Sequence, residues 1–162
     1  MSSGGLGHLM RRFAGSLSRR PPAEADVTWA VAWLEPAEVE LWSAMSVADQ
    51  RHSIEVARRF VGRIGDRPER AEVAAALLHD VGKTVADLGT FGRVGATVWC
   101  RALGRERAST GDGRISRYVR HEALGADMLR VAGSAPRTVA LVATEVDADD
   151  PAARALAWAD EI

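Results

Sequence analysis

The residues best placed to do chemistry lie in the run His79-Asp80-Val81-Gly82-Lys83, which follows a run of six apolar residues. An imidazole and a carboxylate are both good ligands for divalent metal ions. Neighbouring residues on a helix point about 100° apart, so His79 and Asp80 can reach one ion only from the rim of a groove. Other helices would have to supply the remaining ligands. Burying an unpaired imidazole here would be costly, so His79 is expected to have a partner, although the pair could also simply cap a helix.

Candidates for the remaining ligands occur before and after this pair. His52 lies in the preceding predicted helix, His121 in a later one, and Asp160 in the last. Taken singly, Asp160 could be an ordinary surface charge instead of a ligand. His52 could likewise belong to an ordinary solvated helix face. Their order along the chain gives them more weight than each has alone.

This order resembles the HD-domain superfamily of metal-dependent phosphohydrolases over roughly residues 46 to 160. The family pattern is a His, then a His-Asp pair, then a distal Asp, all on helices. The resemblance implies a metal held by His52, His79, Asp80 and Asp160. The frequent His-Asp-x-Gly-Lys extension is matched through Lys83. A His-x-x-x-Gly-Ala element is matched over residues 121–126.

The chain also departs from the family pattern. Members with two metals usually carry further histidines about two dozen residues after the His-x-x-x-Gly-Ala element, where this chain has Ala143-Thr144-Glu145-Val146. The site is therefore more simply interpreted as mononuclear, and a second metal would use His121 and Glu145. The Gly-Tyr-Pro signature of cyclic-di-nucleotide phosphodiesterases is also absent, so that activity is not carried over. Two imidazoles and two carboxylates suit Mn²⁺, Fe²⁺, Co²⁺, Ni²⁺ or Zn²⁺, and Mg²⁺ less readily.

The resemblance implies catalytic roles for Lys83, His121 and Asp80. Lys83 is the one lysine among 21 Lys and Arg residues, which suggests that a compact ammonium is needed there. It would contact the phosphate in the transition state. His121 would be a second-metal ligand or the general acid. Arg117 and Arg120 could hold a second phosphate by bidentate contact, although ordinary surface charges explain them as well.

The elements that must position these residues are helical. No convincing strand pattern or hairpin turn is found, so we expect an all-α bundle of six or seven helices. Residues 1–23 are predicted to be a flexible basic arm and residues 24–162 an HD-domain-like helical domain. The predicted helices begin at or near Pro36, Ser46, Pro68, Phe91, Ile115, Pro136 and Pro151, with Ser46 and Asp49 resembling a capping box. The helix from Pro68 is predicted to end at Gly82, the one from Phe91 near Leu103 and the one or two from Ile115 at Gly133, and the helix from Pro136 is predicted to extend through Val146. The core is expected to contain Trp29, Trp33, Trp42, Trp99 and Trp158.

Composition limits the class of function. A net charge of −1 gives no field that would attract nucleic acid, so no nucleic-acid partner is expected. The single cysteine excludes an intramolecular disulfide and fits a cytoplasmic location. The longest apolar stretch, Val27 to Leu34, is far short of the roughly 20 residues that span a bilayer, and no secretory signal is recognised. We expect a hydrolase for a small phosphorylated substrate, with a nucleotide as one candidate. The alternative is an HD-fold module that binds a metal or nucleotide without turnover.

Overall fold

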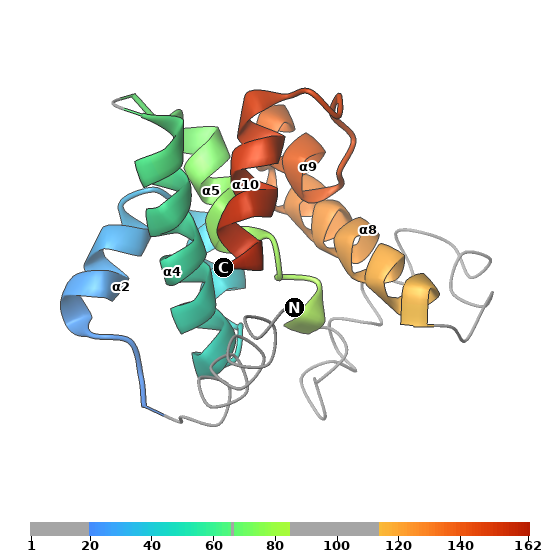
Figure 1. Ribbon diagram of the computed structural model, residues 1–162. Coiled ribbons are helices and arrows are strands. Elements are labelled where there is room, and N and C mark those ends of the chain that lie inside the picture. The colour runs from blue at the N-terminus through green and yellow to red at the C-terminus, as the bar shows by residue number, and fades with distance from the viewer. Residues whose placement is uncertain (1–19, 66, 85–113) are drawn as a thin grey trace, which may run out of the picture.

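The computed structural model describes residues 20–65, 67–84 and 114–162, the side chains of residues 114–121 excepted. Within these residues the chain forms seven helices and no strand, which confirms the predicted all-α fold (Figure 1). None of these helices is both long and apolar enough to cross a membrane. Most of the predicted basic arm and the whole predicted helix over residues 91–103 lie outside the described residues. The helices are α2 (Glu24–Val31), α3 (Pro36–Ser43), α4 (Val47–Ile64), α5 (Arg70–Leu78), α8 (Arg114–Ala132), α9 (Pro136–Val142) and α10 (Pro151–Glu161).

Helix α4 begins where the sequence predicts it. Ser46 is the N-cap, and its Oγ accepts a hydrogen bond from the Asp49 amide at 3.2 Å while donating to Asp49 Oδ2 at 2.6 Å. This pairing satisfies one of the amides that a helix start leaves free. The inward face of α4 is also fixed by polar contact, because Trp42 Nε1 of α3 donates to Ser53 Oγ at 3.0 Å. Ser53 follows His52, so these contacts set the rotation of the helix that carries the first predicted ligand.

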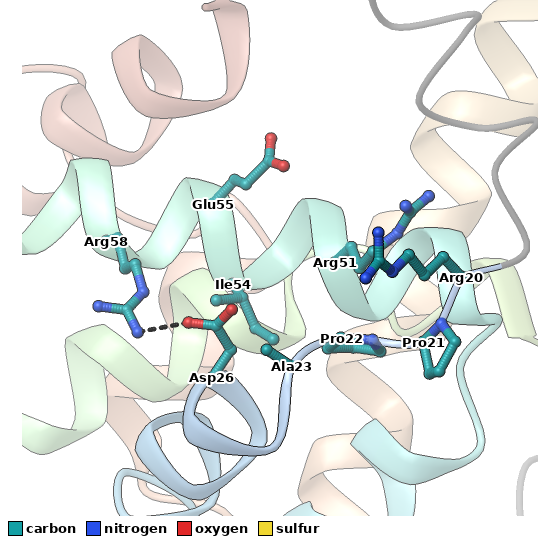
Figure 2. A pocket seen from close by; sticks show the side chains of 9 residues that line it. All are labelled: Arg20, Pro21, Pro22, Ala23, Asp26, Arg51, Ile54, Glu55 and Arg58. Carbon is teal, nitrogen blue, oxygen red and sulfur yellow. Dashed lines mark hydrogen bonds and ion pairs between the residues drawn. The ribbon is translucent and has the colours of Figure 1, made fainter.

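A groove of about 230 Å³ lies between α4 and the segment from Arg20 to the first turn of α2 (Figure 2). The groove is lined by three arginines, Arg20, Arg51 and Arg58, and by the carboxylates of Asp26 and Glu55. Arg58 donates to Asp26 Oδ1 at 2.6 Å and so joins the two helices. None of the four predicted metal ligands lines this groove.

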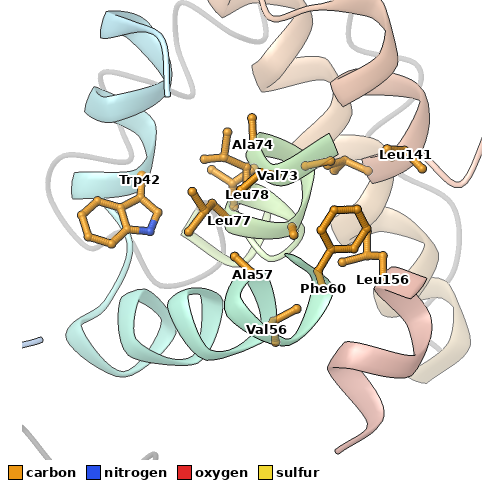
Figure 3. Close-up of a cluster of buried hydrophobic side chains, with 14 of the residues drawn as sticks. Trp42, Val56, Ala57, Phe60, Val73, Ala74, Leu77, Leu78, Leu141 and Leu156 are labelled. Atoms are coloured by element: carbon orange, nitrogen blue, oxygen red, sulfur yellow. The ribbon is translucent and has the colours of Figure 1, made fainter. Parts of the chain in front are cut away.

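Helix α5 is the centre of the hydrophobic core. Every residue from Val73 to Leu78 is buried, so the helix is enclosed on all sides from Val73 to its end, as an apolar helical segment must be. Figure 3 shows Leu77 and Leu78 among side chains of α4, α9 and α10, including Phe60 and Leu156. Each fully buried side chain of this size stabilises the fold by about 1.5–3 kcal/mol. The end of α5 is therefore firmly held, and His79 follows it directly.

The ends of α5 differ from the prediction. The helix begins at Arg70 with Glu69 as its N-cap, so Pro68 precedes the helix instead of opening it. It ends at Leu78, before Gly82, and residues 79–82 form a tight turn. The Val81 amide donates to the Leu78 carbonyl at 3.0 Å, three residues back, in place of the four-residue spacing of an α-helix. The His-Asp pair therefore lies on this turn and not inside a helix.

Helices α8 and α9 end by capping at their C-termini. Gly133 takes φ +75°, and the Ser134 amide donates to the Leu129 carbonyl at 3.0 Å, which closes α8 in a Schellman arrangement. Helix α9 was predicted to extend to Val146 but ends at Val142. Thr144 adopts φ +56°, a left-handed conformation that reverses the chain direction there.

Arg137 of α9 ties the start of α10 to two other helices. Asp150 is the N-cap of α10, and its two oxygens accept from Arg137 at 2.7 and 2.9 Å. The same guanidinium donates to Glu72 Oε1 of α5 at 2.8 Å. Arg137 lowers the pKa of Asp150 to about 2. These charge-assisted contacts fix the start of α10, the helix that carries Asp160.

The prediction that all five tryptophans lie in the core is wrong for Trp158. Trp42 is buried, with 2% of its surface exposed, and Trp29 and Trp33 are partly buried against the core. Trp158 is 37% exposed, because three alanines and Leu156 form the inward face of α10. Trp99 lies outside the described residues.

Candidate metal centre

His52 and Asp160 meet where α4 and α10 lie side by side (Figure 1). His52 Nε2 is 2.9 Å from Asp160 Oδ1, although the two residues are 108 positions apart in the sequence. The side chains are 27% and 34% exposed, so the contact lies at the rim of the helical bundle and is open to small molecules. Two of the four predicted ligands are thus in direct contact.

His79 lies at the centre of the cluster, with its two ring nitrogens in different roles. Nδ1 is 2.9 Å from the Ala76 carbonyl, which can only accept, so Nδ1 carries the proton and donates. In the neutral ring this leaves the lone pair on Nε2. Nε2 is buried and makes no hydrogen bond to any described residue. A histidine that ligates a metal characteristically donates its other N–H to a carbonyl or carboxylate in this way.

The atoms around His79 Nε2 have the spacing of ligands that share one ion. Nε2 lies 3.5 Å from Asp80 Oδ2 and 3.6 Å from Asp160 Oδ1. Both distances are too long for hydrogen bonds. Two ligand atoms that each lie about 2.1 Å from a tetrahedral ion would be roughly 3.4 Å apart. Donor atoms of His52, His79 and Asp80 all lie within 4.8 Å of one another. These three donors therefore suit a divalent metal, whereas Asp160 contacts both histidines but is not part of this three-residue group.

The electrostatics of the cluster also fit a cation. Burial of His79 disfavours its charged form, but the carboxylates of Asp160 and Asp80 outweigh burial and raise its pKa above the ordinary value. His52, and after it His79, holds the pKa of Asp160 well below its usual range. Asp160 is therefore an anion at neutral pH. The field inside the cluster favours positive charge, which a proton or a metal ion can supply.

Gly125 of α8 lets that helix approach the turn that carries His79 and Asp80. A Cβ at this position would lie 3.2 Å from Val81 Cγ1 and 3.3 Å from the Gly82 amide nitrogen. Both distances are tighter than ordinary van der Waals contact, so a side chain here would push the turn away from α8. Ala126, the next residue, is fully buried. Close packing of α8 against the turn after α5 thus explains Gly125 and Ala126, the Gly-Ala part of the His-x-x-x-Gly-Ala element.

Lys83 lies beside the cluster and already has a partner. Its Nζ is 2.5 Å from Asp80 Oδ2, the same oxygen that faces His79. The lysine side chain is 50% exposed, whereas that of Asp80 is 14% exposed. Lys83 is thus next to the cluster, as its predicted role requires, and in this structure its ammonium is the counter-ion of Asp80.

The other predicted site residues are not brought into the cluster by the described contacts. Glu145 is paired with Arg130, Oε2 to Nη2 at 3.0 Å, and its side chain is 63% exposed. Positions 117, 120 and 121 lie in the first half of α8. The side chains of Arg117, Arg120 and His121 are outside the described residues, so their predicted roles stay predictions.

The sequence analysis missed the groups that orient the ligands. The Ala76 carbonyl fixes the His79 ring, and Arg59 of α4 donates to the backbone carbonyl of Ala159, the residue before Asp160. Backbone acceptors have no sequence signature. Arg59 does have one, since it lies two helical turns after His52 and therefore on nearly the same face of α4.

Comparison with known proteins gives no relative. No protein-family model, no curated protein and no solved structure matches the chain. The case for function therefore depends on the residues and on their geometry.

Proposed function

We propose that this chain is a metal-dependent phosphohydrolase of the HD-domain kind, acting on a phosphate ester of a small molecule such as a nucleotide. One divalent ion, of Mn, Fe, Co, Ni, Zn or Mg, would be held by His52, His79, Asp80 and Asp160. Such an ion lowers the pKa of a bound water toward about 7 and neutralises charge on a phosphate oxygen. The observation that supports the proposal most is the buried Nε2 of His79, which has no hydrogen bond and faces two carboxylates at 3.5 and 3.6 Å.

The protein's own groups would prepare the site before substrate arrives. The Ala76 carbonyl holds the proton of His79 on Nδ1, away from the cluster. Asp80 and Asp160 would supply two negative charges that offset the ion. Because the ligands come from α4, from the turn after α5 and from α10, the packing of these three segments sets the site's geometry. Preorganisation of this kind is what electrostatic catalysis requires.

Lys83, His121 and the two arginines would act on the substrate. Lys83 is half exposed and adjacent to Asp80, so its ammonium can reach a phosphate bound at the cluster. Position 121 lies one turn of α8 before Gly125, the residue that packs against the His79 turn. That register supports a role for His121 as the general acid or as a ligand of a second ion. Arg117 and Arg120 would bind a further phosphate of the substrate.

A second candidate is a binding module that holds a metal or nucleotide without turnover. One observation favours it: Lys83 is engaged by Asp80, so its charge is partly neutralised. The pairing of Glu145 with Arg130 also engages the carboxylate that was predicted as a second-metal ligand. The two candidates differ in whether a phosphate ester is cleaved.

Hydrolysis assays separate the two candidates. The full chain would be tested on a panel of phosphomonoesters, phosphodiesters and nucleotides with Mn²⁺, Ni²⁺ or Mg²⁺. We expect release of phosphate or of a nucleoside product that EDTA abolishes and Mn²⁺ restores. Nucleotide binding by calorimetry with no hydrolysis across the panel would favour the binding module instead.

A further inference from the structure

Arg59 of α4 contacts the segment of α10 that carries Asp160. Its Nη1 donates to the Ala159 carbonyl at 3.2 Å, and its Nη2 lies 3.6 Å from Glu55 Oε2, one turn back on α4. The arginine side chain is 33% exposed, so the contact is partly shielded from water. A cation at this end of α10 also interacts favourably with the negative end of the helix dipole.

Asp160 needs such a contact more than the other ligands do. His79 and Asp80 follow the buried end of α5, and His52 precedes the buried Ser53. Asp160 has the most exposed side chain of these four residues, at 34%. The inward face of α10 consists of Ala152, Ala155, Leu156 and Ala159. Small side chains form shallow ridges, so packing alone fixes the register of α10 along α4 less tightly than larger side chains would.

We propose that Arg59 is a positioning residue for Asp160, and this proposal depends on the proposed metal centre. By holding the carbonyl of the preceding residue, the guanidinium sets the position of α10 along α4. That position determines where Asp160 Oδ1 lies relative to His52 and His79. Arg59 itself would not touch the metal or the substrate. Glu55 contacts the other terminal nitrogen of the guanidinium, at the longer distance of 3.6 Å, and would have a smaller effect.

The test is a Co²⁺ titration of the full chain, monitored by the visible absorption of the bound ion. Co²⁺ absorption depends on the number and geometry of its ligands, so it reports on Asp160 directly. We expect Arg59→Gln to weaken Co²⁺ binding by about 10-fold or more, as the loss of partners that orient ligands generally does. The absorption spectrum of the bound Co²⁺ should change as well. Arg59→Lys keeps the charge and should recover part of the affinity.

Arg63→Gln is the matched control. Arg63 is one turn further along α4 and also contacts α10, with its guanidinium 4.9 Å from the centre of the Trp158 ring. It makes no described contact with the backbone beside Asp160. We expect this variant to bind Co²⁺ within about twofold of the wild-type protein and with an unchanged spectrum, although it also loses a contact between the same helices.

The possible outcomes separate this proposal from the metal centre itself. Wild-type protein that binds Co²⁺, with an Arg59→Gln variant of equal affinity and identical spectrum, would overturn the positioning role and leave the metal centre intact. Equal losses in the Arg59 and Arg63 variants would overturn it too, since any contact between α4 and α10 would then serve. Wild-type protein that binds no Co²⁺ would overturn both. If circular dichroism shows that Arg59→Gln is unfolded, Arg59→Lys and Glu55→Gln are compared with the wild-type protein instead. Weakened Co²⁺ binding in these two variants supports the proposal, and wild-type Co²⁺ affinity in both overturns it.

Discussion

His79→Ala and Asp80→Ala should each abolish metal binding and hydrolysis while leaving the helices folded. His79 Nε2 is the atom that both carboxylates face, and Asp80 Oδ2 is one of the two oxygens nearest to it. Loss of a residue that only orients a ligand weakens metal binding by 10–100-fold, so loss of a ligand itself should weaken it by more than about 100-fold. Metal affinity by Co²⁺ titration and helix content by circular dichroism check the two parts of this expectation.

The fold should survive because the pair lies on a turn at the edge of the core. Both side chains keep some exposure, 13% for His79 and 14% for Asp80. Glu145→Gln is the control, since that carboxylate is exposed and paired with Arg130, and it should bind one ion as the wild-type protein does. If Glu145→Gln lost as much metal affinity as His79→Ala, the metal site would have to lie elsewhere than at the proposed ligands. Unfolding of the His79 and Asp80 variants with no loss of metal affinity would show that the pair is structural.

Lys83→Ala should reduce turnover by on the order of 10²–10³ while metal content stays near one ion per chain. The reason is the loss of a charge that stabilises the transferring phosphate, by analogy with lost oxyanion donors. Lys83→Arg should recover only part of the rate, because a planar guanidinium cannot take the place of a compact ammonium. The measurement is kcat together with metal content for each variant.

The contact between Lys83 and Asp80 makes metal content an essential part of that measurement. Removing the lysine also removes the counter-ion of Asp80, so a changed metal affinity must be separated from a changed rate. A binding module predicts a different pattern, with no turnover in the parent protein and weaker nucleotide affinity in Lys83→Ala. Wild-type turnover that is indifferent to both substitutions would show that Lys83 has no part in catalysis.

The sequence predicted best those features that depend on neighbouring residues. Helix starts and ends are marked by local hydrogen bonding and backbone conformation. Three helices start at or just after Ser46, Pro136 and Pro151, and one ends just before Gly133. The all-α class follows from the same local signals. Where a boundary was missed, as with α5 ending at Leu78, the helix gives way to a tighter turn against which α8 packs at Gly125.

The sequence could name candidate ligands but not their arrangement in space. Nothing local brings Asp160 to His52, because that contact depends on how α10 packs along α4. The contact of Lys83 with Asp80 is close in sequence, yet its geometry depends on the turn after α5. Trp158 was misplaced because it was assigned to the core by its residue type, whereas alanines and Leu156 form the inward face of α10. Arg59 was missed because its partner is a backbone carbonyl.

The central claim is that His52, His79, Asp80 and Asp160 hold one divalent metal ion. Elemental analysis of the full chain, purified without chelator and then dialysed, tests it most directly. We expect one equivalent of a transition metal per chain, or one equivalent taken up when Mn²⁺ is added to chelated protein. Two equivalents would implicate a second site with His121 and Glu145 as its ligands. No metal after purification and no uptake of added Mn²⁺ would contradict the account.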